Sequence, residues 1–199
     1  MSLEVLNTSA NLITVTIVAV TALAALIQLR HLRTGNQTQA LLSVNELLQG
    51  REFREALTLA NIGLESAIAD PAFREYEIAI FRREQPPVNV AQKYIDMHNA
   101  ATKVGNTFEV LGVLVKNRIV DADLFVDSYC GIALGSWKRL ESHIALGRAV
   151  SGNDALLEHY EYLAVISEDW IHSHPSSYPK GVRRFQITKP SPLPSPAAP

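Results

Sequence analysis

A run of 18 uncharged residues near the N-terminus, from residue 12 to residue 29, limits what this chain can fold into more than any other feature. Its polar members are three threonines and Gln28. As an α-helix rising about 1.5 Å per residue, the run would be about 27 Å long, close to the thickness of a bilayer's hydrocarbon core. The run therefore predicts a transmembrane helix at residues 12–29, preceded by a short extracytoplasmic N-terminus at residues 1–11.

Two other readings of this run remain open. A soluble helix buried in a core would also be apolar. A cleaved signal peptide is the second alternative, because Ala22, Leu23 and Ala24 form an A-x-A triplet of the kind that precedes a cleavage site. However, the segment before the run contains Glu4 and no lysine or arginine, whereas a signal peptide begins with a positive region. A retained membrane anchor is the favoured interpretation.

The basic residues next to the run predict its orientation. Arg30 and Arg33 follow the run directly, and nothing basic precedes it. Because positive flanks stay in the cytoplasm, we expect the N-terminus outside and the rest of the chain inside, in a single-pass protein of the cell inner membrane.

Charge and cysteine content narrow the function of the remaining chain. Residues 36–178 carry 19 acidic and 12 basic side chains, a net charge of −7. An acidic surface disfavours nucleic acid as a partner, since phosphate binding needs cationic groups. Cys130 is the only cysteine, so neither an intrachain disulfide nor a multi-cysteine metal site can form.

Apolar spacing predicts helices throughout residues 30–178, the expected cytoplasmic domain. Thr34-Gly35-Asn36 offers a break after the anchor, followed by a short amphipathic helix that Gly50 closes. A second helix is expected from about residue 51 to 69, and a third from about 71 to 83, with Asp70 as its N-cap and Pro71 at its first position. Period-two alternation is not sustained anywhere, so we expect essentially no sheet.

The clearest pattern comes from two heptad-like seams, in which apolar residues recur at alternating steps of three and four. The first comprises Tyr94, Met97, Ala101, Val104, Phe108, Leu111 and Val115. The second comprises Val126, Cys130, Ala133, Trp137, Leu140 and Ile144, after Asp121 as N-cap. Two such helices joined by a short turn should pack antiparallel. A last helix should follow a break at residues 147–152, starting at Asn153 or Asp154.

The end of the chain loses this periodicity. Residues 179–199 are first basic and then proline-rich, and five of the ten prolines lie in the last 11 residues. This composition predicts a disordered tail. The predicted fold class is therefore all-α: one N-terminal transmembrane helix, a helical-bundle cytoplasmic domain and a disordered proline-rich tail.

Sequence motifs of common enzymes are missing: the chain contains no glycine-rich phosphate loop, H-E-x-x-H, C-x-x-C or G-x-S-x-G. Glu109 would be an acid or base if buried, but its place beside the first seam favours solvent exposure. Cys130 is expected to be a small core residue rather than a nucleophile. Asp169 and His172 share a helix face, with His174 beyond, yet a cationic C-terminal turn is the better interpretation. We therefore assign no catalytic, cofactor-binding or metal-binding residues, and no cofactor.

Four glycines, Gly105, Gly112, Gly131 and Gly135, fall inside predicted helices, where we expect them to permit close approach of a neighbouring helix.

Four segments carry a resemblance: ALIQLRHLRTGNQTQALLSVNEL from the end of the apolar run onward, FEVLGVLVKNRIVDADLFVDSYCGIALGSWKRL, EYLAVISEDW, and SYPKGVRR near the end. Together they resemble a bacterial group of membrane proteins called domain of unknown function 4760. The resemblance implies a bacterial, membrane-anchored helical protein and implies no activity.

The leading functional hypothesis is a protein-interaction or self-association module at the inner face of the membrane, attached to lipid by its N-terminal helix. The alternative is a membrane-associated enzyme or small-molecule sensor with a site assembled between helices. Three or more polar residues meeting in one pocket would favour the alternative; the candidates are Glu109, Asp96, His98, His143, His159 and Glu161. The interaction hypothesis predicts that Phe108→Asp abolishes folding or association and that Glu109→Ala leaves both intact.

Overall fold

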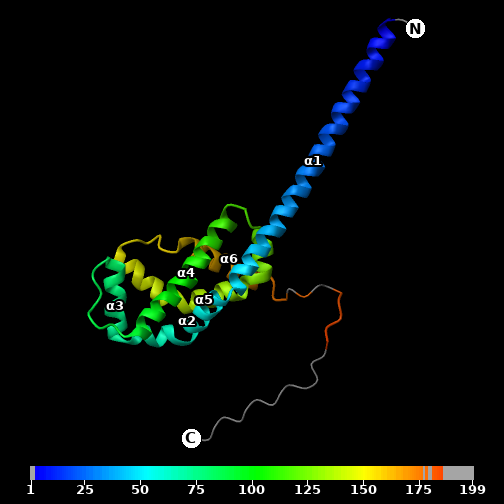
Figure 1. Ribbon diagram of the computed structural model, residues 1–199. Helices are drawn as coiled ribbons and strands as arrows, with labels where there is room; N and C mark the ends of the chain where they lie inside the picture. Colours follow the sequence, from blue (N-terminus) through cyan, green and yellow to red (C-terminus); the bar gives the residue numbers. More distant parts are fainter. Residues whose placement is uncertain (1–2, 177, 179–180, 186–199) are drawn as a thin grey trace.

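The computed structural model describes residues 3–176, 178 and 181–185, with side chains from residue 14 onward except at 33 and 34. These described residues form six helices: α1 (Leu3–Gln49), α2 (Arg51–Ala69), α3 (Pro71–Arg82), α4 (Gln92–Lys116), α5 (Ala122–Ser151) and α6 (Glu158–Ser173). The described residues include no strand, which confirms the predicted all-α class. Figure 1 shows α2 to α6 as a bundle, with α1 projecting far beyond it on the side away from α3. Of the predicted disordered tail at residues 179–199, the structure describes only residues 181–185, so the rest of this prediction lies outside the described residues.

The first helix is continuous, so the predicted break at Thr34-Gly35-Asn36 is wrong. One helix of 47 residues contains the apolar run and, in its last turns, the residues that pack against the bundle. A single glycine in a helix costs only about 1 kcal/mol, and the leucines, arginines and glutamines beyond this triplet favour helix. At its C-terminal end, Val44 and Leu48 are buried in the core, in agreement with the amphipathic pattern expected there.

The core of the bundle forms around α4, which packs against α2, α5 and α6. From Met97 to Val115 the first predicted seam is buried, and most of the second seam is buried too. At its centre the Phe108 ring is fully buried, stacks on Tyr160 with centroids 4.8 Å apart, and meets Phe53 edge-on at 5.7 Å. Both heptad-like seams are therefore true core faces.

Two helix starts follow their sequence signals. The Asp70 side chain accepts a hydrogen bond from the backbone N–H of Ala72, with Pro71 at the first position of α3. The Asp121 side chain accepts from the backbone N–H groups of Asp123 and Leu124 and caps α5. Both aspartates satisfy N–H groups that a helix leaves without partners at its N-terminus.

The boundary between α5 and α6 differs from the prediction. Helix α5 runs through Gly147 to Ser151 and is capped by Gly152, whose φ of 65° is the left-handed conformation that glycine adopts readily. Asn153 does not start a helix; its side chain accepts from the backbone N–H of Ala155 within a turn. Leu157 then takes a left-handed φ of 57°, and α6 begins only at Glu158.

Two of the four predicted glycine contacts are confirmed. A Cβ on Gly105 would lie 2.9 Å from the Leu157 side chain, and one on Gly112 would lie 2.1 Å from the backbone oxygen of His159. The start of α6 therefore reaches α4 only because these positions lack side chains. At Gly131 and Gly135 a Cβ would meet nothing within 4 Å, so the prediction is wrong there.

Candidate functional site

Three ionisable side chains from three helices meet inside the bundle: Glu77 of α3, His98 of α4 and His143 of α5. Their possible metal-binding atoms all lie within 4.8 Å of one another. Glu77 comes four residues after the buried Phe73, so the helical repeat turns its side chain inward. His143 lies three residues after the buried Leu140 and faces inward for the same reason. We call these three residues the Glu-His-His cluster.

Both imidazoles contact the same carboxylate. The Nδ1 atom of His98 is 3.0 Å from Oε1 and 3.1 Å from Oε2 of Glu77. The Nε2 atom of His143 is 3.0 Å from Oε2. Each ring can donate one N–H to the carboxylate. Helices α4 and α5 are therefore both connected to α3 through Glu77.

The cluster is buried, and its burial is uneven. The Glu77 side chain is 0% exposed, that of His143 7% and that of His98 17%. Burial alone raises the pKa of the Glu77 carboxyl, but hydrogen bonds from His143 and His98 outweigh it and hold this pKa below its ordinary value. These contacts favour the anionic form of Glu77 in the interior of the bundle.

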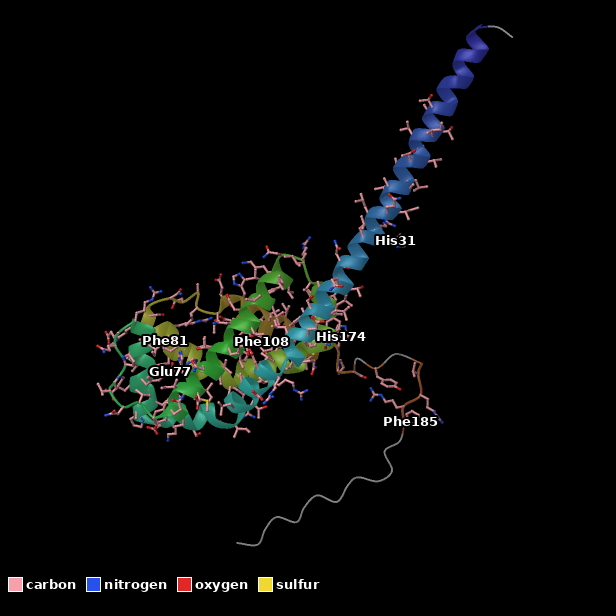
Figure 2. All side chains as sticks on the ribbon, viewed as in Figure 1. His31, Glu77, Phe81, Phe108, His174 and Phe185 are labelled. Carbon is pink, nitrogen blue, oxygen red and sulfur yellow. The ribbon has the colours of Figure 1, made fainter. Side chains whose placement is uncertain are left out.

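Two aromatic rings flank the cluster. The Tyr76 ring meets the His98 ring edge-on at 5.8 Å, and the Phe81 ring lies 5.3 Å from that of His143. On the more open side, the Thr102 hydroxyl is 3.4 Å from Nε2 of His98. Figure 2 shows Glu77 and Phe81 at the end of the bundle opposite to the projecting part of α1.

A second polar contact lies at the start of α6, where Glu109 substitutes for a missing N-cap. The cap position, Leu157, offers no side-chain hydrogen bond. Instead, Oε2 of Glu109 accepts from the backbone N–H groups of His159 at 3.0 Å and Tyr160 at 2.9 Å. Its Oε1 is 2.7 Å from Nδ1 of His159, whose Nε2 is 3.0 Å from Nζ of Lys116.

Glu109 is thus a structural cap supplied by another helix. The expectation that it is solvent-exposed is wrong, since its side chain is only 26% exposed. The geometry also revises the expectation that Glu109→Ala leaves folding intact.

The six polar residues that could have met in one pocket are instead distributed over several places. His98 and His143 lie in the Glu-His-His cluster, whereas Glu109 and His159 lie at the start of α6. Asp96 accepts a hydrogen bond from Gln92, and Glu161 pairs with Arg148 at 2.6 Å. No three of the six converge. The third member of the cluster is Glu77, which the sequence analysis did not single out.

The other residues considered in the sequence, Cys130, Asp169, His172 and His174, lie in or beside the C-terminal end of α6. Cys130 is partly buried against the core, as expected, and lines an open hollow of about 490 Å³ together with Asp127 and His174. Asp169 and His172 are exposed. Glu168, one turn before His172, pairs with Lys138 at 3.2 Å.

A signal for Glu77 was present in the sequence. In the helix from Pro71 to Arg82, Phe73, Glu77 and Ile80 follow the i, i+4, i+7 pattern of one face, so the apolar face contains a carboxylate. A charged residue at a core position needs partners there. The sequence could not identify His98 and His143 as those partners, because they lie 21 and 66 residues further along the chain.

The sequence model of a family described as Domain of unknown function (DUF4760) matches residues 15–170. The chain belongs to this family. The match begins inside the apolar run and extends nearly to the end of α6, so DUF4760 includes both the projecting helix and the bundle. Comparisons with curated proteins and with solved structures returned no match.

Proposed function

We propose that this DUF4760 protein is a single-pass membrane protein that holds its helical bundle at the cytoplasmic face of the membrane, where the bundle binds a partner protein. The observation that supports the anchor is the exposure of α1. Nine large apolar residues between Val15 and Leu32 are 49–66% exposed, and no part of the 18-residue apolar window is buried inside the structure. Such a surface needs an apolar environment.

The distribution of these residues around α1 favours lipid over a protein groove. At about 100° per residue, the nine side chains leave no sector of the helix wider than about 60° without one. A groove would cover one face only, whereas a helix that is apolar all round suits a membrane. A soluble core helix would be buried, but the apolar run of α1 is not.

The proposed orientation rests on charge. Arg30 and Arg33 follow the apolar run, and the bundle is acidic. Positive residues next to a span favour its cytoplasmic end, so the bundle would lie inside.

Two considerations support the interaction role: the separation of the six polar candidates from one another, and the effect of the proposed anchor on binding. The six polar candidates do not converge in one pocket. Confinement to a membrane raises the local concentration of a binding module, which strengthens weak contacts. The alternative, a membrane-associated sensor or enzyme, is favoured by one observation, the Glu-His-His cluster.

The anchor and its orientation can be tested by cysteine labelling, because Cys130 is the only native thiol. In a Cys130→Ala background, Ser9→Cys precedes the span and Ala145→Cys lies on the exposed surface of α5. We expect a membrane-impermeant maleimide to label Ser9→Cys in intact spheroplasts and Ala145→Cys only after permeabilisation. The opposite pattern would refute the orientation, and a mature protein starting after Ala24 would refute the retained anchor.

The interaction role needs a separate experiment. The tagged full-length protein and a version lacking residues 1–33 are cross-linked in cells, purified and analysed by mass spectrometry. We expect one partner protein, cross-linked to the bundle at stoichiometric yield and reduced when the anchor is removed. Cross-links only between copies of this chain would instead establish self-association. Recovery of un-cross-linked monomer alone would contradict the interaction role and leave the anchor unaffected.

A further inference from the structure

We propose that Glu77, His98 and His143 form a binding site for one divalent first-row transition-metal ion, with Zn²⁺ as the reference ion. The proposal is independent of the membrane anchor and of any partner protein, because it rests only on the interior of the bundle.

The chemistry of the three side chains fits such an ion. Two imidazole nitrogens and one carboxylate oxygen are ligands that Zn²⁺ and Fe²⁺ take in proteins, often with a further position left for water or substrate. Ca²⁺ and Mg²⁺ prefer sites made of oxygen atoms, which this cluster does not offer. The carboxylate supplies one negative charge, and the neutral rings add none.

The spacing of the atoms also fits. Around a tetrahedral ion with bonds of about 2.0–2.1 Å, two ligand atoms lie about 3.3 Å apart. The contacts from Glu77 to His98 and His143 are 3.0–3.1 Å. Small side-chain rotations would open them by a few tenths of an ångström. All three ligand atoms, the two histidine nitrogens included, lie within 4.8 Å of one another, and all three residues lie in the interior of helices.

The surroundings resemble those of a built site. The carboxylate is fully buried, which is costly unless a positive charge or strong donors compensate. The Thr102 hydroxyl lies near the distal nitrogen of His98 and can accept its N–H when Nδ1 faces the metal. Outer hydrogen bonds of this kind orient metal-binding histidines. The rings of Tyr76 and Phe81 limit access of water, and the partly exposed His98 marks the open side.

The competing explanation is a metal-free polar contact, in which both imidazoles donate to Glu77 and only connect α3, α4 and α5. The two explanations differ in whether the folded chain takes up one metal ion with these ligands. A second Glu-His pair in the same bundle, Glu109 with His159, provides a matched control outside the cluster.

The test uses full-length protein purified in detergent micelles without a polyhistidine tag and stripped of metal by chelation. Co²⁺ is titrated while its visible d–d absorption is recorded, and Zn²⁺ is then added as competitor. We expect one Co²⁺ per chain, displaced by one Zn²⁺. Glu77→Gln, His98→Gln and His143→Gln should each weaken binding by more than the roughly 10–100-fold typical of removing an outer partner of a ligand. His159→Gln should bind as the wild type does.

Far-UV circular dichroism shows whether each variant is folded. A second measurement on the unmodified chain keeps the test decisive if the variants unfold: excess Zn²⁺ should raise the midpoint of thermal unfolding of the wild type and of His159→Gln. Absence of the Co²⁺ band in the wild type would overturn the proposal. A stoichiometry of one that survives all three cluster substitutions would also overturn it, because the ion would then bind elsewhere.

Discussion

Replacing Glu109 with alanine should lower the free energy of unfolding by about 2–3 kcal/mol, because one carboxylate satisfies the start of α6. Loss of a helix N-cap costs about 0.5–2 kcal/mol, and a negative charge at a helix N-terminus contributes about 0.3–1 kcal/mol. The contact of Oε1 with Nδ1 of His159 adds to these losses. The three contributions share one side chain and do not add fully.

The assay is urea unfolding of the full-length protein in micelles, followed by tryptophan fluorescence. The Trp137 ring lies 5.1 Å from the Tyr160 ring of α6, so its emission reports whether α6 is docked. Glu109→Gln keeps one acceptor oxygen and should lose roughly half as much stability. Glu158→Ala is the matched control: it removes a 53%-exposed carboxylate from the same helix end, and we expect a loss below about 1 kcal/mol. If Glu109→Ala stayed within about 0.5 kcal/mol of the wild type, the cross-helix cap would be refuted.

The remaining predictions concern packing, the helix caps and pH. Gly112→Ala should cost about 1–3 kcal/mol or more, because its Cβ would meet backbone atoms, whereas Gly131→Ala has open space and should be neutral or gain up to about 1 kcal/mol; thermal unfolding measures both. Phe108→Asp should leave the bundle unfolded by circular dichroism, whereas Val110→Asp, 55% exposed on the same helix, should fold normally. Hydrogen bonds from the Tyr94 hydroxyl and the Ala72 backbone N–H lower the pKa of Asp70. The stabilising effect of the ionised carboxylate is therefore complete above the ordinary aspartate pKa, and it is lost as the pH falls through the lowered pKa of the folded protein. Urea unfolding between pH 6 and about pH 3 should therefore show a smaller loss in Asp70→Asn than in the wild type; equal losses would contradict that role.

Sequence reasoning succeeded where the determinants are local. Asp70 and Asp121 cap helices through bonds to residues two or three positions away, and alternating steps of three and four define a core face within one helix. The all-α class and both seams follow from such patterns. The start of α6 was misplaced because its cap comes from Glu109, about 50 residues earlier.

In the candidate site, too, the sequence predicts local features and not the contacts between helices. The inward position of Glu77 is readable from the spacing of its neighbours in α3, but its meeting with His98 and His143 depends on how three helices pack. Gly112 was correctly expected to permit close approach, yet Gly131 has the same local setting and faces open space. Spacing alone cannot separate a glycine under a neighbouring helix from one facing solvent.

The continuity of α1 has a mechanical consequence. Between Leu29, the last residue of the apolar run, and Ala40, the first residue packed against the core, lie about 16 Å of uninterrupted helix. Because the helix is continuous, the direction in which each apolar side chain points is fixed relative to the direction of the buried Val44 and Leu48. One residue inserted between them would turn the bundle by about 100°, and seven would return it nearly to its original direction. The length of this helical segment therefore determines how far the bundle lies from the apolar run. Its helical rotation determines which face of the bundle is turned toward the apolar run.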